Sequence, residues 1–212
     1  MSVFDGIGGF LGQVIDFLGL SMLDFPGRTV KPRPVVRIIF ESHATTMDNE
    51  MELASGWNDA GLSELGTQQA AELGMRRKQE NFDVIFTSDL QRASRTAEIA
   101  FTHRFPIVHD RRLREVDYGE LTRHPAREVQ GERTNRISVP FPGGESYEQA
   151  SRRMREFLVD LLRDYAGKRV LIIGHRATQY GLEHWINGVP LLEAVTSPWS
   201  WQPGWNYELD QL

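Results

Sequence analysis

Two histidines stand in matching surroundings near opposite ends of this 212-residue chain. His43 follows the apolar run at residues 35–40, and His175 follows the run at residues 170–173. Each run is rich in β-branched side chains and gives way to small residues, which is typical of a buried parallel strand that ends in a turn. Open α/β sheets bind their ligands at the carboxyl ends of such strands. Two imidazoles delivered to one pocket, one attacking and one stabilising, would suit phosphoryl transfer through a histidine.

The rest of the chain alternates strands with helices. Strands are predicted at Val35–Phe40, Val84–Thr87, Ile107–His109 and Val170–Ile173, with an edge strand inside residues 197–209. Helices are predicted at Ser63–Glu80, Leu90–Phe101 and Ser146–Tyr165, and a long loop or helical excursion at Glu120–Pro142. This alternation indicates an α/β fold, a three-layer sandwich with a mainly parallel central sheet.

The N-terminal segment differs from the rest. Apolar residues recur at near-helical spacing between Val3 and Met22, and closely spaced prolines at residues 26–34 indicate a linker. We therefore predict an extension at residues 1–34 and a catalytic domain at residues 35–212. The extension lacks a basic stretch and contains acidic residues, which argues against a signal or transit peptide. Its apolar stripe favours packing on its own domain or on a second copy, as in a homodimer, over a membrane surface.

Composition narrows the class of protein. The formal net charge is −5 and there is no Lys/Arg run, so we expect no nucleic-acid partner. No stretch reaches the roughly 18 apolar residues of a membrane span, which makes an integral membrane protein an unfavoured interpretation. The absence of cysteine excludes disulfides and thiolate chemistry, and we expect a cytoplasmic enzyme. The histidines outside the two strand ends lack metal-ligand spacing, so no metal and no cofactor are predicted.

Six segments, taken in order, resemble the motifs of the histidine phosphatase superfamily, which includes cofactor-dependent phosphoglycerate mutases and broad-specificity phosphatases. They are Ser42–Asn49 (SHATTMDN), Gly56–Ala70 (GWNDAGLSELGTQQA), Thr87–Ala97 (TSDLQRASRTA), Leu113–Gly119 (LREVDYG), Gly143–Ser146 (GGES) and Ile173–His175 (IGH). Each motif alone is weak, but six in order are specific. The resemblance covers about residues 35–209 and implies a phosphoglycerate mutase-like fold.

The resemblance also implies roles for single residues. His43 would attack phosphorus and form a phosphohistidine that water hydrolyses. His175, protonated or as a hydrogen-bond donor, would hold the transferring phosphoryl oxygens. Arg92 would clamp the phosphate, since a guanidinium can donate two hydrogen bonds to it. Asn49 and Thr46 of the first motif would also bind substrate, although an Asn after a strand is equally ordinary turn chemistry.

Glu115 is the expected general acid for the departing alkoxide. Beside a pocket that holds a dianion, its pKa could be raised enough to keep the proton near neutral pH. Asp117 is a weaker alternative. A loop salt bridge with Arg112 or Arg114 would be the ordinary structural role of either carboxylate.

The chain departs from the family pattern beside the nucleophile. Ser42 stands where the motif has arginine, and Ala44 stands where it has glycine. Loss of one preset donor can cost about 2.7–4 kcal/mol of transition-state stabilisation. Arg176, directly after the second histidine, is the expected substitute, and Arg123 is another. The alternative is a pocket that binds phosphate without hydrolysing it, but the other motif residues remain together, which favours compensation.

The expected function is that of a metal-independent phosphatase, a hydrolase of small phosphomonoesters. The residues after Glu115 favour this branch over the mutases, which remain an alternative. A non-catalytic phosphate-binding or regulatory protein would also fit this sequence, as would a protein that acts at membranes through its N-terminal stripe. Trp199, Trp201 and Trp205 could line a substrate mouth, yet aromatic residues near a final strand more often serve packing.

Overall fold

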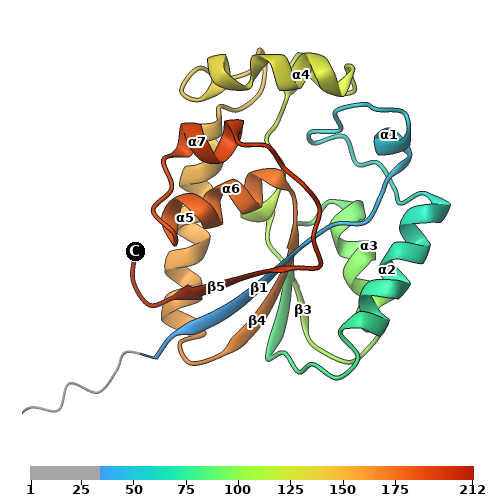
Figure 1. The fold of residues 1–212 in the computed structure, drawn as a ribbon, viewed down its shortest axis with the longest axis vertical. Coiled ribbons are helices and arrows are strands. Elements are labelled where there is room, and N and C mark those ends of the chain that lie inside the picture. The colour runs from blue at the N-terminus through green and yellow to red at the C-terminus, as the bar shows by residue number, and fades with distance from the viewer. Residues whose placement is uncertain (1–33) are drawn as a thin grey trace, which may run out of the picture. The chain divides into compact units, whose positions relative to one another are not determined.

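The computed structural model of the protein describes residues 34–212 (Figure 1). The strands are β1 (Val36–Ser42), β2 (Val84–Thr87), β3 (Ile107–His109), β4 (Arg169–Gly174) and β5 (Trp205–Leu209). The helices are α1 (Met47–Glu50), α2 (Glu64–Arg76), α3 (Gln91–Phe101), α4 (Ala126–Glu132), α5 (Tyr147–Asp164), α6 (Arg176–Trp185) and α7 (Leu191–Thr196). Among these, no helix has the length and apolar character needed to cross a membrane. The predicted N-terminal stripe lies outside the described residues, so the division near residue 34 stays a prediction.

One five-stranded sheet organises these elements, in the order β3-β2-β4-β1-β5. The first four of these strands are parallel to their neighbours, and β5 pairs antiparallel with β1. All five predicted strands are present, and the last one is at the edge of the sheet as expected. The predicted α/β fold with a mainly parallel central sheet is therefore confirmed.

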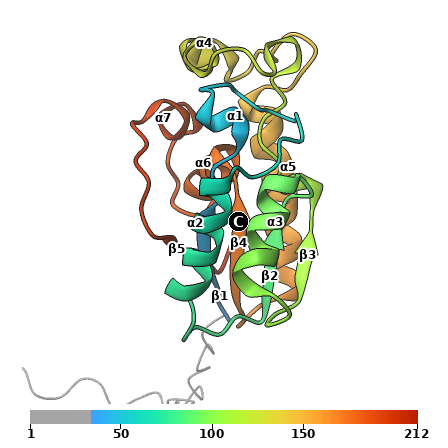
Figure 2. The same ribbon diagram turned by 90° about the vertical axis from the view of Figure 1, so that its right-hand side faces the viewer.

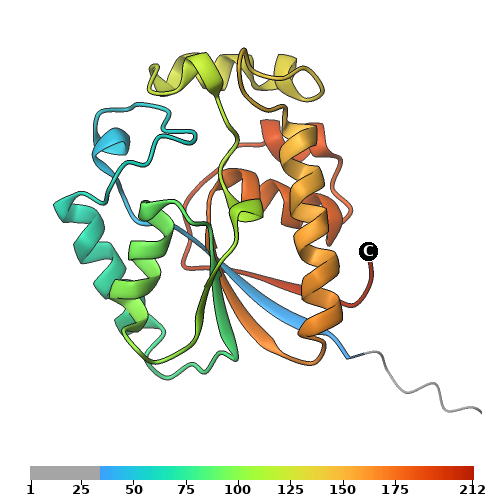
Figure 3. The ribbon, with the colours of Figure 1, turned by 180° about the vertical axis from the view of Figure 1, so that it is seen from behind.

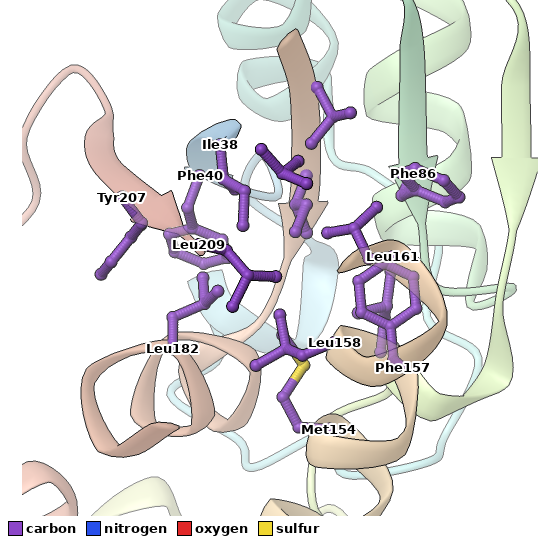
Figure 4. Packing of buried hydrophobic residues seen from close by; sticks show 14 of the residues in the cluster. Ile38, Phe40, Phe86, Met154, Phe157, Leu158, Leu161, Leu182, Tyr207 and Leu209 are labelled. Carbon is purple, nitrogen blue, oxygen red and sulfur yellow. The ribbon is translucent and has the colours of Figure 1, made fainter. Parts of the chain in front are cut away.

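Side chains alternate between the two faces of the sheet, and each face is covered by a different pair of helices. α2 and α3 lie on one side and α5 and α6 on the other (Figure 2). Ile38 and Phe40 of β1 pack toward α5 and α6, whereas Ile39 packs toward α2 and α3. Figure 4 shows the first of these clusters, in which β1, β2 and β5 meet α5 and α6. Each large apolar side chain buried in this way contributes about 1.5–3 kcal/mol.

Two serines start the long helices as the sequence predicts. The Ser63 hydroxyl accepts a hydrogen bond from the Gly66 N–H at 3.1 Å, and the Ser146 hydroxyl accepts one from the Gln149 N–H at 3.2 Å. The Gln149 side chain accepts in return from the Ser146 N–H at 2.7 Å. These are the reciprocal bonds of a capping box, which satisfy backbone donors at the start of α5.

The predicted excursion at 120–142 contains α4 and a 3₁₀ turn, Arg133–Arg136. In Figures 1 and 3 this segment lies at the top of the molecule, the end that also carries α1. Helices α1, α6 and α7 were not predicted. The residue before α6 is His175, which is not a usual capping residue, so the sequence gives no start signal there.

The first turn of α2 packs tightly on the turn that follows β1. The Thr45 carbonyl accepts a hydrogen bond from the Ser63 N–H at 3.0 Å, and the Thr45 N–H donates to the Gln69 side chain at 3.0 Å. A Cβ atom on Gly66 would lie only 1.9 Å from the Thr45 carbonyl oxygen. Gly66 is therefore required for this contact, which fixes the backbone two residues after His43.

We expect Gly66→Ala to lower the free energy of unfolding by about 1–3 kcal/mol, because either α2 or the backbone at Thr45 must move. Gly61→Ala is the matched control, since a Cβ atom there would have no atom within 4 Å. Urea denaturation of both variants measures the effect. A Gly66→Ala protein as stable as the wild type would show that this contact is not tight.

Candidate active site

The parallel pairing of β1 with β4 brings the two histidines together. Ser42 lies opposite Gly174 in the register, and the His43 N–H donates to the Gly174 carbonyl at 3.0 Å. The two strands thus end side by side, and each places its histidine immediately beyond the sheet. The ring centroids of His43 and His175 are 5.0 Å apart, with an interplanar angle of 55°. The predicted meeting of the two imidazoles is present in the structure.

A cavity of about 690 Å³ opens over His43. Residues that line it come from the ends of β1 and α6, from α2, α3 and α4, and from the loops before α4 and β5. Of the residues predicted to act, His43, Asn49, Arg92, Glu115 and Arg176 line this cavity. His175 does not line it: its side chain is buried, with 2% of the residue exposed, and it contacts the His43 ring. Volume and lining fit a small anionic ligand with room for its organic part.

His43 has one ring nitrogen fixed and one available. Its Nδ1 lies 2.7 Å from the Ala44 carbonyl oxygen, which can only accept a hydrogen bond. Nδ1 therefore carries the proton, and Nε2 keeps its lone pair. Burial and the nearby Arg92 charge lower the pKa of His43 to about 3, against an opposing effect of the Ala44 hydrogen bond. The side chain is thus a neutral imidazole suited to nucleophilic attack.

His175 is also neutral in this site. Burial first, and then the positive charge of Arg92, lower its pKa well below the ordinary value of 6.5. Its Nε2 lies 2.7 Å from the Ser88 hydroxyl, while its buried Nδ1 has no hydrogen-bond partner in residues 34–212. The lowered pKa favours a neutral His175 ring over a protonated one.

Arg92 is a buried cation held by backbone carbonyls. It is 2% exposed, and its two terminal nitrogens donate to the carbonyls of Gly56 (2.7 Å) and Asn58 (3.0 Å). Burial lowers its pKa, against the raising effect of nearby acidic groups, Glu115 foremost, and within residues 34–212 it forms no salt bridge with a carboxylate. A buried charge without a counter-charge in direct contact is costly unless an anion binds beside it. Arg92 and the two neutral imidazoles therefore create a site that favours an oxyanion.

Glu115 lies at the cavity in a defined orientation. Its Oε1 accepts hydrogen bonds from the backbone N–H groups of Val116 (2.9 Å) and Ala177 (3.3 Å), the second of which belongs to the first turn of α6. Asp117 does not line the cavity, because its Oδ1 accepts from the Gly119 N–H at 2.9 Å within its own turn. The geometry favours Glu115 over Asp117 as the proton donor.

Of the two first-motif residues predicted as substrate contacts, Thr46 and Asn49, only Asn49 reaches the cavity. The Thr46 side chain is fully buried and caps α1 by accepting from the Asn49 N–H at 3.1 Å, so it does not line the cavity. Asn49 does line it, yet its Oδ1 accepts from the Thr46 N–H at 3.0 Å. The prediction of Thr46 as a substrate contact is therefore wrong, because its hydroxyl is used in the capping box of α1.

The two candidate substitutes for the missing motif arginine separate clearly. Arg123 is half exposed, is paired with Asp48 at 3.3 Å, and does not line the cavity. Arg176 lines the cavity together with Ser42. Of the two, only Arg176 is placed to contact a ligand there.

Some residues of the site were not predicted. Ser88 directly follows β2 and contacts His175, and its position after a strand could have indicated this. Arg133 lines the cavity from the 3₁₀ turn after α4, and its Nε is buried without a partner in the described residues. It lies within the predicted excursion, where no sequence pattern marks it. In residues 34–212 no group of three His, Asp or Glu side chains is arranged to hold a metal ion.

Comparison with known proteins agrees with this geometry. A model of the histidine phosphatase superfamily (branch 1) matches residues 38–199. A 2,3-bisphosphoglycerate-dependent phosphoglycerate mutase from Methylobacterium sp. (strain 4-46) is 34% identical over 189 residues, which cover 73% of this chain and 89% of that protein. The uncharacterized phosphatase PhoE from Bacillus subtilis (strain 168) is 34% identical over 148 residues, 69% of this chain and 75% of that protein.

Among solved structures, YhfR from Bacillus stearothermophilus superposes with a TM-score of 0.70 at 27% identity, over 79% of this chain and 88% of that one. The region that the family model matches contains both histidines and Glu115. The expected phosphoglycerate mutase-like fold is confirmed, and the chain belongs to the histidine phosphatase superfamily, branch 1.

Proposed function

We propose that the protein is a metal-independent phosphatase that hydrolyses small phosphomonoesters through a phosphohistidine at His43. One observation carries the proposal: Arg92 is a buried cation without a carboxylate partner in the described residues, beside two neutral imidazoles. A phosphate group would supply a negative charge in direct contact with Arg92. The Nε2 lone pair of His43 would then be the nucleophile nearest to it.

The proposed reaction has two displacements. His43 Nε2 attacks phosphorus, the bond from phosphorus to the ester oxygen breaks, and Glu115 gives its proton to the departing alkoxide. In the second step Glu115, now ionised, takes a proton from water, whose oxygen attacks phosphorus and releases His43 and phosphate. His175 and Arg92 stabilise the charge on the phosphoryl oxygens in both steps.

Arg176 is the proposed substitute for the motif arginine that Ser42 replaces. It lines the same cavity and starts α6, whose first backbone N–H groups favour an anion. Asn49 is retained as a substrate contact through its side-chain amide NH₂. The cavity volume of about 690 Å³ supports a small-molecule phosphate ester as the substrate. A cytoplasmic location and a homodimer stay predictions.

A phosphomutase is the second candidate, and the similarity to a phosphoglycerate mutase over 73% of this chain favours it. In a mutase, the phosphohistidine would return its phosphoryl group to the bound product instead of to water. Incubation with 3-phosphoglycerate, with and without 2,3-bisphosphoglycerate, separates the two. Release of inorganic phosphate without interconversion of phosphoglycerates supports the phosphatase.

His43→Asn should reduce hydrolysis of p-nitrophenyl phosphate by about four orders of magnitude or more, because the nucleophile is lost. Wild-type activity should be unchanged by a chelator. His103→Asn is the control: His103 is exposed and has a φ of 56°, a conformation that Asn tolerates. Activity that survives in His43→Asn would assign the chemistry to another group.

Glu115→Gln should discriminate between leaving groups. An alkyl phosphate needs a proton on its leaving oxygen, so its hydrolysis should fall about 10²- to 10⁴-fold. The nitrophenolate of p-nitrophenyl phosphate leaves without one, so its release in the first turnover, before water must be activated, should fall less than about tenfold. Asp117→Asn, two residues away, should affect both substrates equally. An equal first-turnover loss on both substrates in Glu115→Gln would contradict the role of Glu115 as the acid.

The His43 ring should remain neutral in mild acid. Because burial and Arg92 lower its pKa to about 3, it gains a proton only well below the ordinary value of 6.5. NMR of ring-labelled histidine should show no titration of His43 between about pH 8 and about pH 4.5, with the His43→Asn spectrum identifying its signal. Arg92→Met removes a repelling charge and should move the midpoint upward. A wild-type midpoint near 6.5 would contradict the site's electrostatics.

A further inference from the structure

The Arg176 side chain is supported at the cavity by an aromatic ring. Its guanidinium lies over the ring of Trp199, with the central carbon 4.6 Å from the ring centroid. Trp199 also lines the cavity, and its indole N–H donates to the Gln179 side-chain oxygen at 2.7 Å. Arg176 and Gln179 are three residues apart on α6 and therefore share one face of that helix. A single tryptophan thus contacts both.

The tryptophan is itself fixed to the sheet. Trp199 stacks on Trp205 at 6.1 Å between ring centroids, with an interplanar angle of 29°. Trp205 begins β5 and pairs with Phe40 of β1, and the centroids of their two rings are 5.6 Å apart. The segment between α7 and β5 is therefore held against the strand that carries His43.

Arg176 differs from the neighbouring cavity cation Arg76. Arg76 is ion-paired with the buried Glu41 at 3.1 Å. Arg176 lines the cavity together with Ser42, and Gly174, two residues before it, is directly opposite Ser42 in the sheet. Arg176 forms no salt bridge within residues 34–212. Its charge is therefore not neutralised by a carboxylate of the described chain.

We propose that Trp199 is a positioning residue, which holds the Arg176 guanidinium at the phosphate site so that the pair replaces the arginine absent from position 42. Stacking on an aromatic face orients the guanidinium plane while its N–H donors, which lie in that plane, stay available for an oxyanion. A carboxylate partner would orient it equally well but would cancel its charge and occupy its donors. The inference rests on the proposed function and names the unit that completes its phosphate clamp.

The test compares Arg176→Ala, Trp199→Ala, Trp199→Phe and the double variant Arg176→Ala/Trp199→Ala. Calorimetry measures the binding of orthovanadate and of inorganic phosphate, and p-nitrophenyl phosphate hydrolysis gives kcat and KM. We expect Arg176→Ala to lower kcat by about 100- to 1,000-fold. Trp199→Ala should lower it by about 3- to 30-fold, and Trp199→Phe, which keeps an aromatic face, by less. The double variant should be no worse than Arg176→Ala alone, because both changes disable one unit.

Two further variants sharpen the test. Arg155 lies over the Trp185 ring at 5.2 Å, a similar stack whose residues do not line the cavity, so Arg155→Ala should leave binding and turnover unchanged. Adding Ser42→Arg to Arg176→Ala should raise kcat at least about tenfold over that of Arg176→Ala alone, because the new arginine supplies a cation from β1. A merely structural role of Trp199 would not give the shared loss, and the rescue would show that a cation at position 42 and Arg176 act at the same site.

The outcomes distinguish the inference from the proposed function. If the wild type hydrolyses esters but the losses of Arg176→Ala and Trp199→Ala multiply in the double variant, the inference fails and the phosphatase stands. If the wild type hydrolyses nothing while both variants lose vanadate and phosphate binding together, the phosphatase fails and the clamp stands. A wild type that binds neither oxyanion would overturn both.

Discussion

The site depends on the parallel pairing of β1 with β4. Two segments from opposite ends of the chain are held in one register, so that Ser42 lies beside Gly174 and the next residue of each strand is a histidine. A slip of one residue would turn every side chain of β1 to the other face of the sheet, moving Ile38 and Phe40 out of their core. The buried apolar side chains that stabilise the sheet therefore also fix the distance between the two imidazoles.

That geometry has an electrostatic consequence. Because the strand ends are buried, both histidines are neutral, and the positive charge of the site comes from arginines, of which Arg92 acts on both rings. An entering dianion would favour the protonated form of each imidazole and so raise its pKa. His175, which has one ring nitrogen without a partner in the described residues, can take up that change. Binding of the proposed substrate would then be what protonates His175.

The sequence predicts those features that depend on local pattern. Apolar β-branched runs mark the strands, Ser63 and Ser146 mark two helix starts, and the motif order marks the histidines. Features that depend on tertiary contacts escape it. Thr46 carries a hydroxyl that could contact a ligand, but this hydroxyl caps α1 instead. The role of Trp199 depends on a loop far from Arg176 in the chain, and no spacing rule connects the two.

The position of a phosphate-binding cation in the fold determines what else it needs. The backbone at the end of a central strand is held by hydrogen bonds to a strand on each side. Arg176 instead starts a helix and has a long, unbranched side chain. Arginine has about 2 kcal/mol of rotamer entropy to lose when it is fixed. The Trp199 ring restricts that freedom before any ligand arrives, and the β5 pairing restricts Trp199 in turn. The proposed clamp, displaced from β1 to α6, would thus depend on the edge strand, which makes β5 part of the proposed phosphate site.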